Sequence, residues 1–171
     1  MPVRLQLGDF VSSVKMLAWA KLNDCAWDEV SCSDVAERGH VEVLQWARQH
    51  GCPWHEDTCR VAAMGGHLEA LQWARANDCP WNAKTCTHAA DNKHLEVLQW
   101  ARQQGCPWDE ETCRAAAAGG YLEVLQWAWA NDCPWDEGTC EEGRGGRASG
   151  GVEVGAGTRL PVGRGDVSRR R

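Results

Sequence analysis

The ten cysteines are the residues of this sequence best suited to chemistry, because a thiol can bind a metal ion, form a disulfide or stay buried as a small apolar group. They form two series: Cys25, Cys52, Cys79, Cys106 and Cys133, and Cys32, Cys59, Cys86, Cys113 and Cys140. Each first-series cysteine is followed, after six intervening residues, by one of the second. Strong zinc signatures use a closer spacing, and the N-terminal residues lack the apolar block of an export signal. Reduced, buried thiols without a metal site are therefore the favoured interpretation, with metal binding and disulfides as alternatives.

Other candidate catalytic groups also recur once per repeat. One position is occupied by His40, His67, His94 and Tyr121, and another by Glu42, Glu69, Glu96 and Glu123. A catalytic histidine is not expected in every copy of a repeat, and the glutamates are typical of solvent-exposed helix faces. The sequence contains no phosphate-binding glycine loop and no nucleophile elbow. It therefore predicts no enzyme, no catalytic residue and no cofactor.

The positions of these residues show a repeat of fixed length. Tryptophans occur at positions 19, 46, 73, 100 and 127 and again at 27, 54, 81, 108 and 135, a step of 27 residues that both cysteine series share. Self-similarity at such a period indicates a solenoid, in which each unit buries its apolar face against its neighbours. The recurring tryptophans are expected to form a core ladder, with Trp73 and Trp100 mostly buried against the equivalent positions of adjacent units.

Each unit is predicted to contain two short helices. In residues 67–77, helical periodicity gathers Ala70, Leu71, Trp73 and Ala74 on one arc. A Cys-Pro-Trp segment then prevents the helix from continuing. Good N-cap residues for the next helix follow at Asp28, Asn82, Asp109 and Asp136, with His55 as the exception. The predicted fold class is all-α, a helical-hairpin solenoid.

The segment TCRVAAMGGHLEALQWARANDC resembles the ankyrin repeat, whose pattern is TPLHxAAxxGHLEVVxxLLxxGA. The resemblance covers about residues 10–140. The TPLH start is absent, and the unit is six residues shorter than the family's usual length of about 33, so the β-hairpin finger is missing. The resemblance implies ankyrin-like helical repeats, a structural histidine that links neighbouring turns, and protein binding along the first helices.

Three regions are expected along the chain. Residues 1–27 form a degenerate N-terminal half repeat, and residues 28–140 form the solenoid, with units 28–54, 55–81, 82–108 and 109–135. Residues 141–171 are a Gly/Arg-rich tail without tryptophan or cysteine, which is typical of disorder. Shifting the reading frame of VGAGTRLPVGRGDV by one base, with suitable codons, gives WARERDCPWDEGT in register with the repeats. We interpret the tail as a sixth repeat translated out of frame.

Charge limits the classes of partner. Residues 1–140 contain 11 basic and 20 acidic residues, a balance of −9, and the tail contains 7 and 4, a balance of +3, which together give the net charge of −6. An acidic body without a basic stripe disfavours nucleic acid as a partner. No apolar run approaches the roughly 18 residues of a membrane span. The sequence predicts a cytoplasmic monomer that binds neither nucleic acid nor membrane.

One surface differs from copy to copy while the packing positions stay constant. We call it the variable strip, and it lies on the first helix of each unit. Its predicted partner-binding residues are Asp34, Glu37, Asp57, Arg60, Val61, Met64, Lys84, His88, Asp91, Glu111 and Arg114. A constant packing face with a varied exposed face is typical of a modular binding surface. The predicted function is a non-catalytic scaffold for an unidentified protein partner. The alternatives are a thiol-rich metal-binding or redox-buffering protein, or a truncated gene product with no active role.

Overall fold

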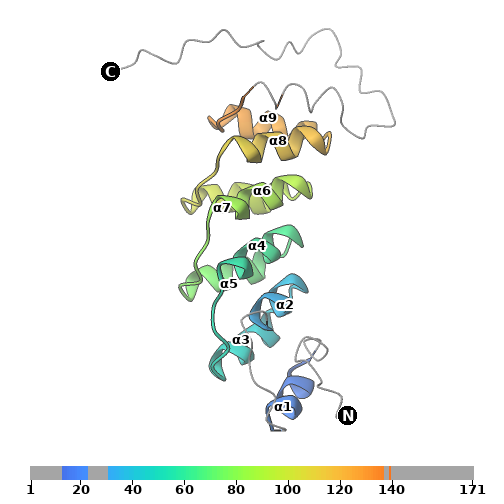
Figure 1. The fold of residues 1–171 in the computed structure, drawn as a ribbon, viewed down its shortest axis with the longest axis vertical. Helices are drawn as coiled ribbons and strands as arrows, with labels where there is room; N and C mark the ends of the chain where they lie inside the picture. The colour runs from blue at the N-terminus through green and yellow to red at the C-terminus, as the bar shows by residue number, and fades with distance from the viewer. Residues whose placement is uncertain (1–12, 23–30, 137–138, 140–171) are drawn as a thin grey trace, which may run out of the picture.

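The computed structural model describes residues 13–22, 31–136 and 139 (Figure 1). Within those residues the chain forms nine α-helices and no strand. The helices are α1 (Val14–Leu22), α2 (Ser31–Glu37), α3 (Val41–Gln49), α4 (Glu56–Met64), α5 (Leu68–Ala76), α6 (Ala83–Asp91), α7 (Leu95–Gln103), α8 (Glu110–Ala118) and α9 (Leu122–Ala130). The predicted all-α fold class is confirmed.

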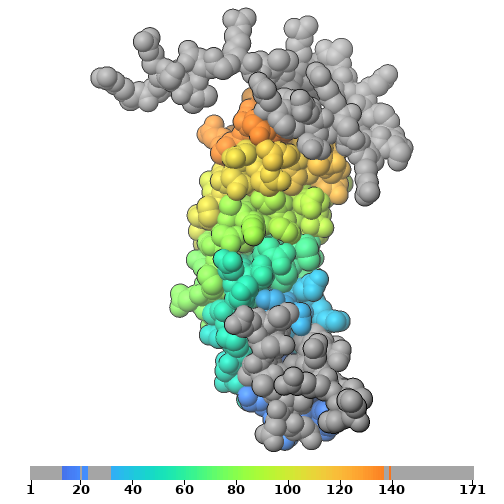
Figure 2. All heavy atoms as spheres, viewed as in Figure 1, coloured from blue at the N-terminus to red at the C-terminus, as the bar shows by residue number. Residues whose placement is uncertain are grey.

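Each repeat is an antiparallel helical hairpin, and successive hairpins stack along one axis (Figure 1). The hairpins are α2–α3, α4–α5, α6–α7 and α8–α9, and α1 precedes them at the place of a second helix. The first helices pack closely, α2 on α4, α4 on α6 and α6 on α8, whereas the second helices approach one another less closely. Figure 2 shows the repeats as successive bands of one elongated body. This arrangement is a helical-repeat solenoid.

The second helices end in a left-handed residue followed by the Cys-Pro-Trp segment. After α3 and α7 this residue is a glycine, Gly51 with φ of 88° and Gly105 with φ of 80°. After α5 it is Asp78, with φ of 61°. The next amide reaches back to the last helical turn, as in the Cys79 N–H bond to the Ala74 carbonyl at 3.0 Å. These bonds satisfy carbonyl groups that the end of a helix leaves without partners. The predicted helix ends are therefore present.

The N-caps of the first helices differ from expectation at two positions. His55, which we expected to be an exception, caps α4: its Nδ1 accepts from the Asp57 N–H at 3.2 Å, as a neutral imidazole can. The Thr58 hydroxyl completes the cap by accepting from the His55 N–H at 3.4 Å. Asp109 occupies the cap of α8, but its side chain caps no amide. Asn82 caps α6 as predicted, through the Lys84 N–H at 3.0 Å.

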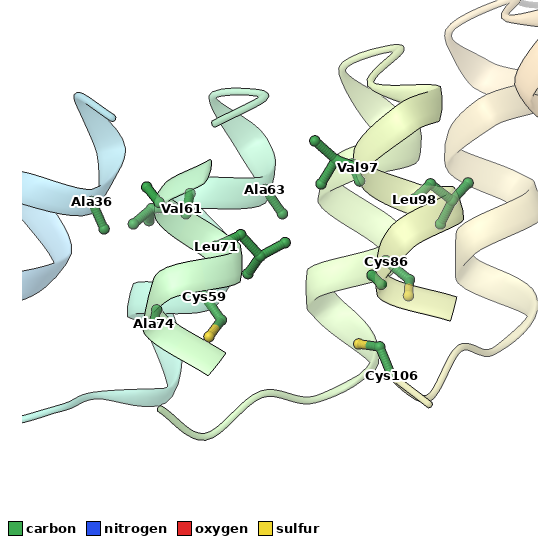
Figure 3. Close-up of a cluster of buried hydrophobic side chains, with 14 of the residues drawn as sticks. Ala36, Cys59, Val61, Ala63, Leu71, Ala74, Cys86, Val97, Leu98 and Cys106 are labelled. Atoms are coloured by element: carbon green, nitrogen blue, oxygen red, sulfur yellow. The ribbon is translucent and has the colours of Figure 1, made fainter. Parts of the chain in front are cut away.

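The core is a row of leucines and alanines rather than a ladder of tryptophans (Figure 3). The second helices contribute Leu44, Leu71 and Leu98, all fully buried. The first helices contribute small side chains such as Ala62 and Ala63, also fully buried, which allow the helices to approach closely.

The tryptophans are only half buried, contrary to the expectation of burial against equivalent tryptophans. Three second-helix tryptophans instead contact the loop tryptophan of the preceding repeat. The ring centroids are 5.8 Å apart for Trp54 and Trp73, 6.0 Å for Trp81 and Trp100, and 5.9 Å for Trp108 and Trp127. The loop turns its tryptophan toward the next helix, and edge contact leaves part of each ring in solvent.

Two histidines each link their hairpin to the preceding one. The Nε2 of His67 donates to the Glu37 carbonyl at 2.8 Å, and that of His94 donates to the Met64 carbonyl at 3.1 Å. The imidazole ring lies against the glycine corner, where a Cβ added at Gly39 would come within 2.4 Å of His67. The predicted structural role of these histidines is confirmed.

None of the helices in the described ranges is long and apolar enough to cross a bilayer. Residues 1–12 and the tail at 141–171 lie outside the described residues. The interpretation of the tail as a frame-shifted repeat therefore stays a prediction. The repeat boundaries remain predictions.

Candidate binding surface on the first helices

Two hollows between neighbouring first helices bring most of the variable strip together. The hollow between α2 and α4 has a volume of about 420 Å³. It is lined by Ser33, Asp34, Glu37, His55, Asp57, Arg60, Val61 and Met64. The hollow between α6 and α8 has a volume of about 680 Å³. Its lining is Lys84, Thr87, His88, Asp91, Asp109, Glu110, Glu111, Arg114, Ala115 and Ala118.

The hollows form because the packing side of each first helix is built from alanine, cysteine and threonine. Positions such as Cys59 and Ala62 face the interior, and the positions between them point outward. Of the predicted residues, Val61 is the least accessible, with 7% of its surface exposed, so only its edge reaches the hollow. Glu37, Lys84, Asp91 and Glu111 are exposed.

The arginines of the strip are paired with nearby carboxylates. Arg60 Nε lies 2.5 Å from Asp57 Oδ1, one helical turn earlier. Arg114 bonds to Glu111 Oε2 at 2.5 Å and to Asp136 Oδ2 at 2.6 Å, which connects α8 to the start of the next repeat. The hydrogen bond from Arg60 lowers the pKa of Asp57, and that from Arg114 lowers the pKa of Asp136. Both carboxyl groups are therefore ionised at neutral pH.

Carboxylates outnumber cations in both hollows. The first is lined by Asp34, Glu37 and Asp57, with Arg60 as its cation. The second is lined by four carboxylates, Asp91, Asp109, Glu110 and Glu111, against Lys84 and Arg114. Each hollow therefore presents acidic groups around a partly apolar floor, and the two differ in shape and chemistry.

A second pair of hollows, on the second helices, was missed by the sequence reasoning. The hollow of about 490 Å³ between α3 and α5 includes Gln45, Arg48 and Trp73 in its lining, and the one of about 440 Å³ between α7 and α9 includes the equivalents Gln99, Arg102 and Trp127. Treating the tryptophans as fully buried concealed these sites. The polar residues flanking each tryptophan in LQWAR are the signal that could have revealed them.

Arginines of the second helices lie over the tryptophans of the loops that follow them. The guanidinium carbon of Arg75 lies 4.2 Å from the centre of the Trp81 ring, and that of Arg102 lies 4.1 Å from the Trp108 ring. Arg75 Nη1 also donates to the Cys79 carbonyl at 2.5 Å. The same geometry in successive repeats indicates a role in stability.

The cysteines come together in a pairing that the spacing did not suggest. Cys32 and Cys52 form a disulfide, with Cα atoms 6.2 Å apart, which corrects the expectation of reduced thiols for this pair. Six further cysteines are buried and free: Cys59, Cys79, Cys86, Cys106, Cys113 and Cys133. In the described part of the chain, no three histidine, cysteine or acidic side chains gather so that they could hold a metal ion.

No family model matches the chain, and no curated protein matches it. Among solved structures it is similar to the pentatricopeptide repeat protein PPR10 in complex with an 18-nucleotide psaJ RNA element, with 16% sequence identity and a TM-score of 0.43. The match covers 81% of this chain and 25% of that chain, so this chain spans about a quarter of that protein's length. The likeness concerns the type of fold.

This comparison corrects the expectation that nucleic acid is excluded as a partner, because a helical-repeat structure of this kind is recorded with RNA bound. Our exclusion relied on the missing basic stripe. The chain is a helical-repeat solenoid protein.

Proposed function

We propose that this protein is a non-catalytic repeat scaffold that binds a partner protein through the variable strip. The observation that carries the proposal is the position of the hollows. They lie between α2 and α4 and between α6 and α8, where the exposed residues differ from one repeat to the next. Each repeat can therefore contribute its own contacts to one continuous surface.

The chemistry of the hollows favours a partner segment with basic side chains. Exposed carboxylates such as Glu37 and Asp91 have room for a lysine or arginine of a partner beside them. Apolar groups at Met64 and Ala118 offer contact area next to these charges. Complementary charge steers the approach of a partner, and apolar contact prolongs the complex.

The finer proposal is that the solenoid is a shortened ankyrin-like array. The helical hairpins, the Gly-His corners and the cross-repeat bonds of His67 and His94 support it. Without the fingers, the first helices alone would form the binding side, and the affinity should be modest.

Affinity capture with the full chain tests the function. The variant Glu37→Lys/Asp91→Lys reverses one exposed carboxylate in each hollow and should reduce capture of an identified partner at least about tenfold, roughly 1.4 kcal/mol of binding free energy. The matched control is Glu69→Lys/Glu96→Lys, which makes the same charge change at exposed positions of the second helices and should leave capture intact.

Two outcomes would contradict the proposal. Equal loss of capture in both variants would indicate that net charge, not the strip, determines binding. Capture that disappears when the sample is treated with ribonuclease would indicate that the bound molecule is RNA.

A further inference from the structure

Each of the four complete hairpins brings two buried sulfur atoms together at its loop end. One cysteine lies in the first helix, and the other lies twenty residues later, just after the second helix. The pairs are Cys32 with Cys52, Cys59 with Cys79, Cys86 with Cys106, and Cys113 with Cys133. Figure 3 shows Cys86 of α6 and Cys106 of the following loop next to one another below Leu98. The two cysteines meet because the second helix runs antiparallel to the first, and so it brings the chain back to the end of the hairpin where the first helix begins.

Two observations indicate that the three free pairs are equivalent to the joined pair. In the first of these repeats Cys59 Sγ donates to the Cys79 carbonyl at 3.9 Å, and in all three the two cysteines lie close enough for one thiol to shift the pKa of the other. The loop cysteine is also held in the same way in all four repeats, by a backbone bond from its N–H to an alanine in the second helix. These bonds are Cys52 to Ala47 at 3.0 Å, Cys79 to Ala74 at 3.0 Å, Cys106 to Ala101 at 2.9 Å and Cys133 to Ala128 at 3.0 Å.

The hairpin brings the two cysteine positions within the reach of a disulfide. The Cα atoms of Cys32 and Cys52 are 6.2 Å apart, inside the range that disulfides ordinarily span. The period of 27 residues places the other three pairs at the same two positions of the hairpin.

We propose that every complete repeat carries a redox-active dithiol that closes to a disulfide by exchange with a small-molecule disulfide such as glutathione disulfide. In each repeat two S–H bonds break and one S–S bond forms. The glutathione disulfide is reduced to two glutathione thiols, which take up the two electrons and two protons. The reverse exchange reopens the pair.

Closure would link the start of a hairpin to its end, and not one repeat to the next. It therefore strengthens each unit without altering how the units stack. A disulfide that closes a loop of this length stabilises a fold mainly by restricting the unfolded chain. The set of pairs would make the stability of the solenoid respond in steps to the redox state.

Burial determines how fast the exchange can occur. In two pairs the interaction raises the pKa of one thiol and lowers that of the other: it raises the pKa of Cys59 and lowers that of Cys79, and it raises the pKa of Cys133 and lowers that of Cys113. Because all of these sulfur atoms are buried, a small-molecule disulfide reaches them slowly in the closed fold. Exchange should become faster at higher pH, where more of each thiol is present as the attacking thiolate.

The test uses the full chain, first fully reduced and then equilibrated with reduced and oxidised glutathione in increasing ratio. Remaining thiols are alkylated, and disulfide-linked peptides are mapped by mass spectrometry. We expect linkages Cys59–Cys79, Cys86–Cys106 and Cys113–Cys133, each with the loss of two hydrogens. The oxidised protein should also melt about 5 °C or more above the reduced protein.

Linkage between sequence neighbours, such as Cys79 with Cys86, would overturn the proposal. So would complete alkylation of all six thiols under conditions in which Cys32 and Cys52 are joined. Peptide mapping separates these results from any reaction of Cys25 or Cys140.

The variant Cys79→Ala sharpens the assignment. Cys59 should then remain alkylatable, while the Cys86–Cys106 linkage should form as in the unmodified chain. Circular dichroism checks that the variant is folded, and Cys59→Ala serves as the second variant if it is not. A new partner for Cys59 in the folded Cys79→Ala protein would show that the pairs are not defined by the hairpin.

Discussion

The first-helix side and the second-helix side of the solenoid are built from the same repeat, but their exposed residues differ in how much they vary between copies. On the first-helix side, small residues such as Ala62 and Ala63 make the contacts between repeats, and the outward positions vary from copy to copy. On the second-helix side, the segment LQWAR recurs almost unchanged, and its leucine, tryptophan and arginine all take part in packing.

The difference shows where a repeat protein can change. The packing side of the first helix is constant, and the outward positions beside it remain free to differ between copies. The second helix has its leucine in the core, its tryptophan against the preceding loop and its arginine on the following loop. Its exposed positions, such as Glu69 and Gln72, recur from copy to copy, which limits the variety of chemistry that it can present.

The largest effect is expected for Leu98→Ala. Leu98 is fully buried, so removing its side chain should lower the free energy of unfolding by about 2–5 kcal/mol, through lost burial and the cavity left behind. Denaturant unfolding of both proteins measures the difference. The control is Leu122→Ala, at a leucine with 40% of its surface exposed, where the loss should be much smaller.

Trp100→Ala should have an intermediate effect. Its ring is half buried and meets Trp81 at a centroid distance of 6.0 Å, so we expect a loss of about 2 kcal/mol, below the roughly 3–5 kcal/mol typical of fully buried aromatic side chains. A loss as large as that of Leu98→Ala would place the tryptophan in the core after all.

The arginine–tryptophan contacts can be tested by removing one and by adding one. Arg102→Met keeps the apolar stem but removes the charge above Trp108 and the bond to the Cys106 carbonyl, and it should cost about 1–2 kcal/mol. In the last repeat Trp129 stands where the others have arginine, with 44% of its surface exposed.

Trp129→Arg should therefore raise the melting temperature, because it would place a guanidinium above Trp135. An unchanged or lower melting temperature would indicate that the Trp129 contact with Trp135, at a ring-centre distance of 6.5 Å, is equally stabilising.

The variable strip should be the most tolerant region. Arg60→Glu together with Arg114→Glu breaks surface ion pairs and places a new carboxylate beside Asp57 and beside Glu111, which are small effects at solvent-accessible positions, so helicity and melting temperature should change little. Capture of a partner with basic side chains should be strengthened, because the change adds negative charge to both hollows. Capture that is unaffected by this change but abolished by altering Gln72 and Gln99 would place the binding surface on the second helices.

The smallest effect concerns pH. The hydrogen bond from Arg60 lowers the pKa of Asp57, so this carboxyl group contributes stability above its unfolded pKa, and the contribution disappears as pH falls through the lowered folded value. The pair is partly exposed and therefore screened by solvent. Melting curves between about pH 5 and pH 2 should show a slightly shallower decline for Asp57→Asn than for the unmodified chain. An equal decline in the two proteins would show that Arg60 does not act on Asp57 in solution.

The sequence was sufficient for the repeat length, the two helices per unit and the cysteine, proline and glycine punctuation between them, because these depend on local periodicity and backbone preference. It also placed the outward positions of the variable strip, since helical geometry determines which residues share a face. It could not show that Arg60 and Arg114 are already paired, because the Arg114 partner Asp136 belongs to the next repeat.

What only the tertiary structure decided is which repeated residues meet. Six residues separate Cys79 from Cys86 along the chain, yet Cys79 lies beside Cys59 because the hairpin folds back on itself. The tryptophans pair between a loop and the next helix for the same reason, and His55 caps α4 because the loop orients its ring toward the helix amides. Period and composition can be read along the chain, whereas these contacts depend on how two helices and a loop pack in space.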